Sequence, residues 1–450
     1  MRLAWPVLAE EILNLLVGFT EWWLAGHFFE GTQYKAAMTL AMYALWVTPS
    51  LFSAVAIGTT ALTARFIGAG EPDRARHVLH QSLLVGGLLS VLVTAGVLAW
   101  SEDFVAAMNY RDDAAARAIE YLAILAVVVP AIMFEQVVIA GLRGAGDTVS
   151  GLVAKVGVNV VNAIVSAGCV VGWGLFPQIG WRGLALGAAS GHVVGALILL
   201  VILLRGRAGL RLRLSDFRPD RDLIRRLLRV GLPGGFDVLA VVACHLAYLA
   251  IISRLGPLAA GGHGLGVQLE SLVYSAGAAF YVAAATLTGQ FLGAGDPQRA
   301  AQAVRTTGLI AIVYYSVAGL GLFFGGHLLT GFFTGPEDAG TAMLAADYLR
   351  IVSFSLPSLA IVMVLTGALR GAGDTRWPVM MTFVGLVFVR VCGACFLAWP
   401  EVPLFATGIV LPGLDLNVYG AWYAMVADVV LRSVLFVARF AQGGWKRVKV

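Results

Sequence analysis

The feature that most constrains this chain is a succession of long apolar runs separated by short polar breaks. Each run holds about 20 residues, which is the length that an α-helix needs to cross the ~30 Å hydrocarbon core of a bilayer. Only 13% of the residues are charged, whereas soluble domains carry roughly 25%. We therefore predict an all-α polytopic membrane protein of about 12 transmembrane helices. The runs lie near residues 3–27, 39–64, 78–100, 120–141, 151–174, 183–204, 228–253, 264–289, 303–325, 347–369, 377–399 and 418–440.

A long-period repeat divides these runs into two sets. The sequence Leu-Arg-Gly-Ala-Gly-Asp-Thr occupies 142–148 and returns at 369–375, a displacement of 369 − 142 = 227 residues. A second motif, Phe-x-Gly-Ala-Gly-acid-Pro, occupies 66–72 and 291–297, which lie 291 − 66 = 225 residues apart. Because each half holds an even number of spans, both halves have the same orientation. The prediction is a parallel repeat of two homologous six-helix bundles, an arrangement common among secondary transporters.

The basic residues indicate how the halves are joined and oriented. An arginine-rich stretch, 205–227, links an N-terminal lobe, 1–204, to a C-terminal lobe, 228–450. Further basic residues recur in alternate loops, which is the positive-inside pattern. We therefore expect a multi-pass protein of the cell inner membrane, with both termini and the linker in the cytoplasm. A net charge of +5 distributed in this way does not indicate a nucleic-acid partner.

Small residues in the spans favour close helix packing. Glycines spaced four residues apart place a smooth face on one helix, so that a neighbour can approach closely; they are Gly183, Gly187, Gly191 and Gly195. In the first repeated motif, glycines end a span where a left-handed residue is needed, and Asp147 can cap the next helix. The pair Cys392 and Cys395 has neither a second cysteine pair nor a histidine nearby, so we expect no metal site.

Three motifs together resemble those of the multidrug and toxic compound extrusion (MATE) family. They are the two copies of Leu-Arg-Gly-Ala-Gly-Asp-Thr, the two copies of Phe-x-Gly-Ala-Gly-acid-Pro, and Phe-Thr-Glu-Trp-Trp-Leu-Ala-Gly at 19–26. The resemblance covers essentially the whole chain. It implies a twelve-helix, two-lobed antiporter that exports organic, often cationic, compounds in exchange for protons or sodium.

Polar residues inside the first span are candidates for ion coupling, because charged groups are costly in a bilayer. At about 100° per residue, Glu10, Asn14 and Glu21 fall within ~40° of one another and form one polar stripe, whereas Glu11 points elsewhere. Glu21 is the preferred coupling carboxylate; the family resemblance places an aspartate at this position. Pro6 matches a family proline, and we predict a hinge there because proline removes a backbone hydrogen bond.

The fifth span carries a second polar stripe, which we expect to face a cavity or a partner helix. It consists of Lys155, Asn159, Asn162 and Ser166. Asn162 matches the asparagine of a family Asn-x-x-x-Asp motif, but Ser166 stands where that motif has its aspartate. Candidates to replace the missing acid are Glu10 and Glu135.

The second half differs from the first at the polar positions. Adding 227 to Glu10 and Glu21 gives Asp237 and Tyr248, so the deeper carboxylate is unique to the first half. We include Asp237, Tyr248 and His192 among the cavity residues. The remaining charges of the second half are expected to form a buried ion pair or network; they are Arg390, Asp428 and Arg432.

The sequence thus predicts a secondary active antiporter that exports an organic, cationic or lipophilic small molecule by alternating access. We expect H+ or Na+ as the coupling ion, no cofactor, a lipid bilayer around the chain, and a monomer. One alternative is a lipid-linked precursor flippase, which needs a strongly cationic cavity; the predicted stripes set Glu10 and Glu21 against a single Lys155. An intramembrane enzyme needs a clustered Ser/His or His/Asp constellation, which the sequence lacks. A passive channel is disfavoured by the parallel duplication.

Overall fold

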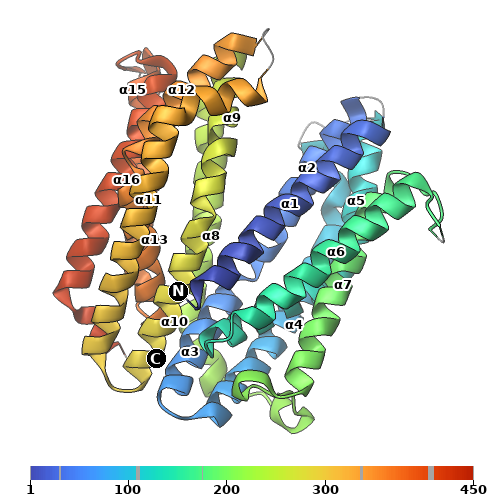
Figure 1. Cartoon of the computed structure of the whole chain (residues 1–450), viewed down its shortest axis with the longest axis vertical. Coiled ribbons are helices and arrows are strands. Elements are labelled where there is room, and N and C mark those ends of the chain that lie inside the picture. Colours follow the sequence, from blue (N-terminus) through green and yellow to red (C-terminus); the bar gives the residue numbers. More distant parts are fainter. Residues whose placement is uncertain are drawn as a thin grey trace. The chain divides into compact units, whose positions relative to one another are not determined.

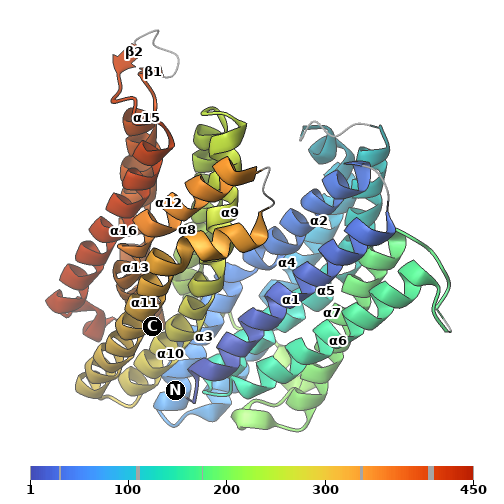
Figure 2. The same ribbon diagram turned by 45° about the horizontal axis from the view of Figure 1, so that its top comes forward.

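A computed structural model describes residues 2–29, 32–107, 112–174, 176–334, 338–403 and 410–448. Almost all of these residues are helical, and the chain forms two compact units (Figures 1 and 2). Unit 1 holds the chain up to Gly235 together with Gly293–Gly295; unit 2 holds Phe236–Leu292 and the chain from Asp296 onward. The all-α polytopic architecture predicted from the apolar runs is confirmed.

The helices of unit 1 pack in sequential pairs. Its elements are α1 (Ala4–Phe28), α2 (Thr32–Leu51), α3 (Ser53–Gly68), α4 (Pro72–Ala107), α5 (Asp112–Gly144), α6 (Val149–Val171), α7 (Arg182–Leu204) and the short turns η1 (Arg207–Gly209) and η2 (Leu214–Phe217). The closest pairs are α6 with α7 and α4 with α5, while α1 lies on α6 (Figure 2). An apolar core is built from side chains such as Phe52, Leu62, Leu79 and Leu142.

The glycine face predicted on 183–204 lies against the preceding helix. A Cβ added to Gly187 of α7 would stand 1.8 Å from the hydroxyl of Ser166 on α6. A Cβ on Gly195 would stand 2.5 Å from the carboxylate of Glu135 on α5. The glycines therefore make room for polar side chains as well as for the backbone of a neighbour.

Unit 2 has a similar set of packed helices. The helix α8 (Arg221–Ser253) leads into it from unit 1, and the elements that follow are α9 (Pro257–Tyr274), α10 (Ala276–Gly293), α11 (Pro297–Phe333), α12 (Ala339–Ser353), α13 (Leu356–Gly371), α14 (Arg376–Phe383), η4 (Val384–Cys392), α15 (Gly393–Ala398), β1 (Glu401–Pro403), β2 (Val410–Pro412), α16 (Asn417–Gln442) and η5 (Gly444–Arg447). The π-helical segment η4 continues α14 into α15 and carries Arg390. The two strands pair antiparallel, with Val402 opposite Leu411. Large side chains, among them Tyr315, Tyr348 and Trp422, fill the core.

The twelve predicted spans correspond to single helices or to helices in series. Among the described residues, 8 helices are long and apolar enough to cross a membrane. Two further spans are bent pairs: α2 and α3 meet at 41°, and α12 and α13 at 58°. Counting each pair once gives up to 10, and the two remaining predicted spans are α1 and α16. Both of these helices carry buried charged side chains, which lower their hydropathy.

Candidate functional site

Glu21, the predicted coupling carboxylate, lies at the centre of a small polar chain in unit 1. Its side chain, on α1, is 1% exposed, and its Oε1 accepts a hydrogen bond from Nδ2 of Asn162 at 2.9 Å. The hydroxyl of Ser166 donates in turn to Oδ1 of Asn162 at 2.8 Å. The structure therefore brings together three predicted residues, Glu21, Asn162 and Ser166, on the packed faces of α1 and α6. Ser166, which replaces the family aspartate, fixes the amide that faces Glu21.

No cationic side chain neutralises Glu21 within the described part of the chain. Its second oxygen, Oε2, has no hydrogen-bond partner there. A further buried group, the hydroxyl of Tyr121 on α5, also lacks a partner among these residues and lies within electrostatic range of Glu21. A charged carboxylate is costly in such surroundings, so a proton or a small cation that neutralises it has a large effect on the energy of this site. Tyr121 is a site residue that the sequence did not single out.

The other acid of the predicted stripe, Glu10, belongs to a separate site. Glu10 is also 1% exposed, but its Oε2 accepts a hydrogen bond from Arg143, at the end of α5. It lies 21 − 10 = 11 residues from Glu21, about 16 Å along the helix axis. Asn14, between them, is exposed and hydrogen-bonds Glu11, which lies in the field of Arg143 rather than apart from it. Glu10 and Glu21 thus share the face of α1 that lies against α6, as the stripe predicted, but they have different partners, and Asn14 does not join them.

The pairing of Glu10 with Arg143 recurs in unit 2. Arg370 hydrogen-bonds Asp237, and both side chains are buried. The separations are identical, 143 − 10 = 133 and 370 − 237 = 133, so the two ion pairs occupy equivalent positions in the repeat. Each repeated Leu-Arg-Gly-Ala-Gly-Asp-Thr motif thus ties the end of one helix to the first helix of its own half. The equal spacing was present in the sequence, but spacing alone does not show which acid each arginine contacts.

The aspartates of the same motif are also held in both halves. Asp147 accepts hydrogen bonds from the backbone and hydroxyl of Ser150 and from Arg207, at 3.0 Å. Asp374 accepts from Arg439, at 2.6 Å. Burial raises the pKa of Asp147, but the bonds from Ser150 and Arg207 outweigh it, and its pKa lies below the usual range. The expected cap by Asp147 is confirmed.

The motif glycines adopt the backbone conformation predicted for them. Gly146 has φ = 89° and Gly373 has φ = 84°, in the left-handed region that disfavours other residues. Each lets the chain turn out of one helix and into the next. In each copy of the motif, the glycine therefore allows the helix to end, and the ion pairs of the arginine and the aspartate hold that helix end in place.

A second polar cluster of unit 1 contains the predicted residue His192. Glu135 on α5 is fully buried and accepts a hydrogen bond from Nζ of Lys155 on α6 at 3.1 Å. Nδ1 of His192 on α7 lies 3.2 Å from the same carboxylate. Asn159 donates to the backbone oxygen of Lys155 at 2.6 Å and is largely buried. His192, Lys155 and Asn159 therefore surround Glu135 rather than Glu21.

Unit 2 holds the expected buried charge network. Asp428 on α16 accepts from Arg390 at 2.9 Å and from Arg432 at 2.7 Å. The ring of Tyr248, 3% exposed, lies 5.9 Å from the Arg390 guanidinium. The prediction of an ion network is confirmed, and Tyr248, the counterpart of Glu21, contacts its cationic edge.

Pro6 does not break a hydrogen bond of α1. The helix begins at Ala4, so Pro6 lies in the first turn, where backbone N–H groups have no acceptor within the helix. Its counterpart Pro233 lies inside α8. The reason given for a hinge at Pro6 therefore does not hold in this structure, whereas it applies to Pro233.

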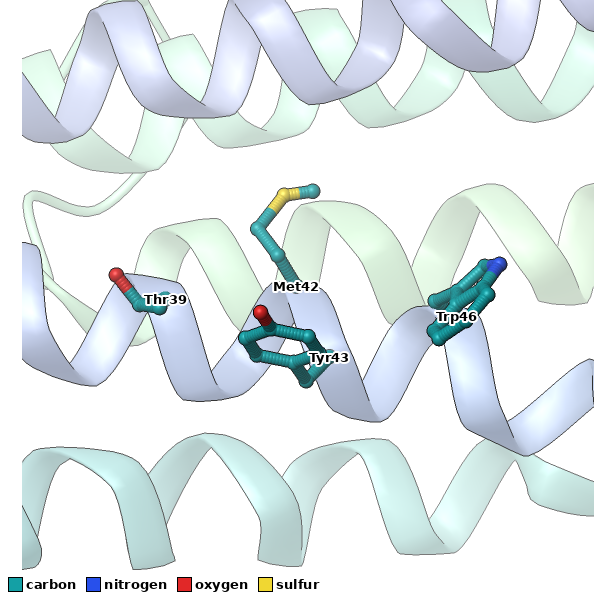
Figure 3. A pocket seen from close by; sticks show the side chains of 4 residues that line it. All are labelled: Thr39, Met42, Tyr43 and Trp46. Atoms are coloured by element: carbon teal, nitrogen blue, oxygen red, sulfur yellow. The ribbon is translucent and has the colours of Figure 1, made fainter. Parts of the chain in front are cut away.

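A shallow hollow on α2 is lined by Thr39, Met42, Tyr43 and Trp46 (Figure 3). These residues are spaced three and four apart, so they share one helix face. Sδ of Met42 lies near Gly18 of α1. The lining carries no charged side chain, so this hollow is distinct from the polar chain of Glu21.

Comparison with known proteins identifies the family. A family model described as MatE matches residues 6–167 and 233–395. The chain belongs to the MatE family. The two matched segments begin 233 − 6 = 227 residues apart, the displacement of the sequence repeat. The family resemblance drawn from the motifs is confirmed, as is the multi-pass membrane character.

Individual MatE relatives match over nearly the whole chain. A probable multidrug resistance protein NorM of Thermotoga maritima is 26% identical over 99% of this chain and 92% of its own. The multidrug resistance protein MdtK of Pectobacterium atrosepticum is 26% identical over 97% of this chain and 93% of its own. Among solved structures, an outward-facing multidrug resistance MATE family transporter of the MOP superfamily has a TM-score of 0.88 at 20% identity, covering 99% of this chain and 96% of the other. The similarity to this solved structure shows that the two chains share a fold.

Proposed function

We propose that this protein is a secondary active efflux antiporter that exports organic, cationic or lipophilic compounds in exchange for protons or sodium. Its membership of the MatE family supports a transport role. Relatives that are 26% identical along nearly the full chain carry the name multidrug resistance protein. Alternating access then requires that the ion and the substrate have different affinities for the two states of the transporter.

The observation that carries the coupling assignment is the isolation of Glu21. It is buried, it is bonded to the neutral amide of Asn162, and it pairs with no cation among the described residues. The net charge at Glu21 therefore changes by one unit when it gains or loses a proton, or when sodium binds or leaves. Such a change can bias one conformation of α1 against another, since burying an unpaired charge costs several kcal/mol or more.

The charge balance favours a cationic or neutral substrate over an anionic one. Glu10 and Glu135 are balanced by Arg143 and Lys155, which leaves Glu21 as a fully buried acid of unit 1 that has no ion pair among the described residues. A flippase for lipid-linked precursors needs unengaged basic groups to hold a pyrophosphate. The buried arginines of the described chain (Arg370, Arg390 and Arg432) and the partly buried Arg143 instead contact carboxylates.

The remaining parts of the proposal follow from composition and topology. We place the protein in the inner membrane as a monomer, with both termini in the cytoplasm and with no cofactor beyond the coupling ion. The alternate basic loops support this orientation. Fusing a reporter enzyme that is active on only one side of the membrane to each terminus tests it.

Ethidium efflux from proteoliposomes tests the coupling assignment. An imposed pH or sodium gradient drives wild type, Glu21→Gln and the matched control Glu102→Gln, an exposed acid at the end of α4. We expect Glu21→Gln to lose gradient-driven efflux and Glu102→Gln to keep it. Efflux by Glu21→Gln at the wild-type rate, under the gradient that drives the wild type, contradicts the assignment.

A further inference from the structure

Unit 2 contains a second acid that lacks a cationic partner, Glu270. It lies on α9 and is partly buried, and its Oε2 accepts a hydrogen bond from the hydroxyl of Tyr348 on α12. Tyr348 itself is fully buried. Among the described residues Glu270 forms no ion pair, and the side chain that donates a hydrogen bond to it is a neutral phenol.

The other buried acids of unit 2 are bonded to arginine. Asp237 pairs with Arg370, Asp374 with Arg439, and Asp428 with both Arg390 and Arg432. Asp347 is bonded to a tyrosine hydroxyl, that of Tyr419 at 2.7 Å, but Tyr419 is partly exposed. Among the described acids of unit 2 that are at least partly buried, Glu270 therefore has neither an arginine partner nor a partly exposed one.

The repeat relates the surroundings of Glu270 to those of Glu21. Tyr348 is the counterpart of Tyr121, since 348 − 121 = 227, and Tyr121 lies within electrostatic range of Glu21. Each unit thus sets an acid beside the same repeat tyrosine. In unit 1 the acid comes from the first helix, and at the equivalent place unit 2 has Tyr248. In unit 2 the acid comes from α9, and the equivalent stretch of unit 1, residues 43–45, holds no acid.

Aromatic rings connect Glu270 to the rest of this polar region. The ring of Tyr348 meets His263 edge to face at 5.3 Å, and His263 meets Tyr248 at 5.7 Å. The Tyr248 hydroxyl and Nδ1 of His263 are buried and have no hydrogen-bond partner in the described chain. The titratable and charged groups that act on Glu270 or share its network come from α8, α9, α11, α12, η4 and α16; they are His245, Tyr248, His263, Tyr274, Tyr315, Tyr348, Arg390, Asp428 and Arg432.

We propose that Glu270 is a second proton-accepting carboxylate of the transport cycle, located in unit 2 and held by Tyr348. This inference rests on the proposed antiport. The proton adds to a carboxylate oxygen and neutralises Glu270, and the same proton leaves when a cationic substrate favours the charged form. Arg390 is already engaged by Asp428, so it does not substitute for that proton. The protein then exchanges protons at two places rather than one.

Substrate-induced proton release from the purified full-length protein tests this inference. Ethidium is added in weakly buffered detergent solution, and a pH dye reports the protons released per ethidium bound. We expect Glu270→Gln and Glu21→Gln each to lose about half of the wild-type release, because each removes one of two linked sites. Asp347→Asn is the matched control, since it alters a carboxylate–tyrosine pair with a partly exposed partner, and it should release as many protons as the wild type.

A conservative variant separates proton exchange from a purely structural role. Glu270→Asp keeps an ionisable carboxyl group, so we expect it to retain most of the release that Glu270→Gln loses. Loss of release in both variants, with ethidium still bound, overturns the inference, and so does full release by Glu270→Gln. If Glu21→Gln alone abolishes release, Glu270 is excluded while the proposed antiport stands. If wild type binds ethidium without releasing protons, both the second site and proton coupling at Glu21 fail.

Discussion

The two repeat units share an ion pair between a motif arginine and an acid of the first helix, which we call the brace, and they differ in their other buried acids. In each unit a motif arginine holds an acid on the first helix, Arg143 with Glu10 and Arg370 with Asp237. Eleven residues further along that helix the units part, with Glu21 in one and Tyr248 in the other. The comparison teaches that both copies kept the groups that fix helix positions, while the buried polar groups further along the first helix diverged.

The divergence extends to the residues around these positions. In unit 1 the amide of Asn162 contacts Glu21, the hydroxyl of Ser166 holds that amide, and the phenol of Tyr121 lies within electrostatic range of Glu21. Unit 2 places Arg390 and Arg432 on Asp428 beside Tyr248. A neutral environment leaves a carboxylate free to exchange an ion, whereas a doubly bridged aspartate stays charged. The two units therefore hold their helices by similar contacts but place different polar and charged groups around equivalent positions.

The largest effect is expected at the position where the two units differ most, which is Glu21 in unit 1 and Tyr248 in unit 2. Glu21→Gln should reduce gradient-driven ethidium efflux by more than about tenfold, because the exchangeable charge is removed. Tyr248→Phe, at the equivalent position of unit 2, should reduce it by less than about threefold, since its hydroxyl has no partner among the described residues. Initial rates in proteoliposomes measure both. Equal losses in the two variants contradict a functional difference between the positions.

The next effect tests the shared brace. Arg143→Ala and Arg370→Ala each leave a buried carboxylate without its cation, which destabilises a protein by about 3–5 kcal/mol. We expect similar drops in thermal unfolding temperature in detergent for both. The double variant Arg143→Ala with Glu10→Ala should recover part of the loss, because no unpaired charge remains. A drop confined to one unit breaks the proposed equivalence of the two braces.

A smaller effect sharpens the description of the Glu21 site. Gly187→Ala puts a methyl group where Ser166 now lies, at a cost of about 1–3 kcal/mol for overpacking. The displaced Ser166 no longer fixes Asn162, so we also expect slower efflux. Gly87→Ala on α4 is the control, since a Cβ there meets nothing within 4 Å. Thermal unfolding and efflux rates of the two variants, measured side by side, decide the matter.

The smallest effect concerns the linker outside the membrane. A hydrogen bond from Arg76 lowers the pKa of Asp216, and the side chain lies near the surface. A lowered pKa in the folded state stabilises the protein above the unfolded pKa of about 3.9, and this contribution is lost as pH falls through the folded value. Asp216→Asn should therefore cost less than about 1 kcal/mol at pH 7. The difference from wild type should shrink as pH falls below about 3.9, as measured by unfolding temperature against pH.

The sequence predicted the helical content, the repeat and part of the site. Helical periodicity and the family motif assigned Glu21 to one polar stripe and Asn162 to another, and the structure joins the two stripes by a hydrogen bond. Periodicity assigns a face but not a partner, which is why Glu10 was grouped with Glu21 although it pairs with Arg143, 133 residues away. Lys155 was assigned to a polar stripe and His192 to the cavity residues, and neither was paired with an acid; α5 brings Glu135 to both of them.

Other parts of the site left no signal in a single chain. Glu270 has no acidic counterpart in the first half, so the repeat did not point to it. Tyr121 and Tyr348 were matched as a pair, but a tyrosine in an apolar run is most often a packing residue. Their importance depends on which acid each approaches, and that depends on packing between helices distant in the sequence.

The paired braces have a consequence for how such a chain can arise. Every atom of the Glu10–Arg143 pair comes from the first half of the sequence, and every atom of the Asp237–Arg370 pair from the second. A six-helix precursor would therefore already contain the ion pair that fixes the position of its first helix, without contacts from a second copy. Joining two copies therefore does not require new contacts to hold either first helix in place. The charged residues elsewhere in each copy can then change independently.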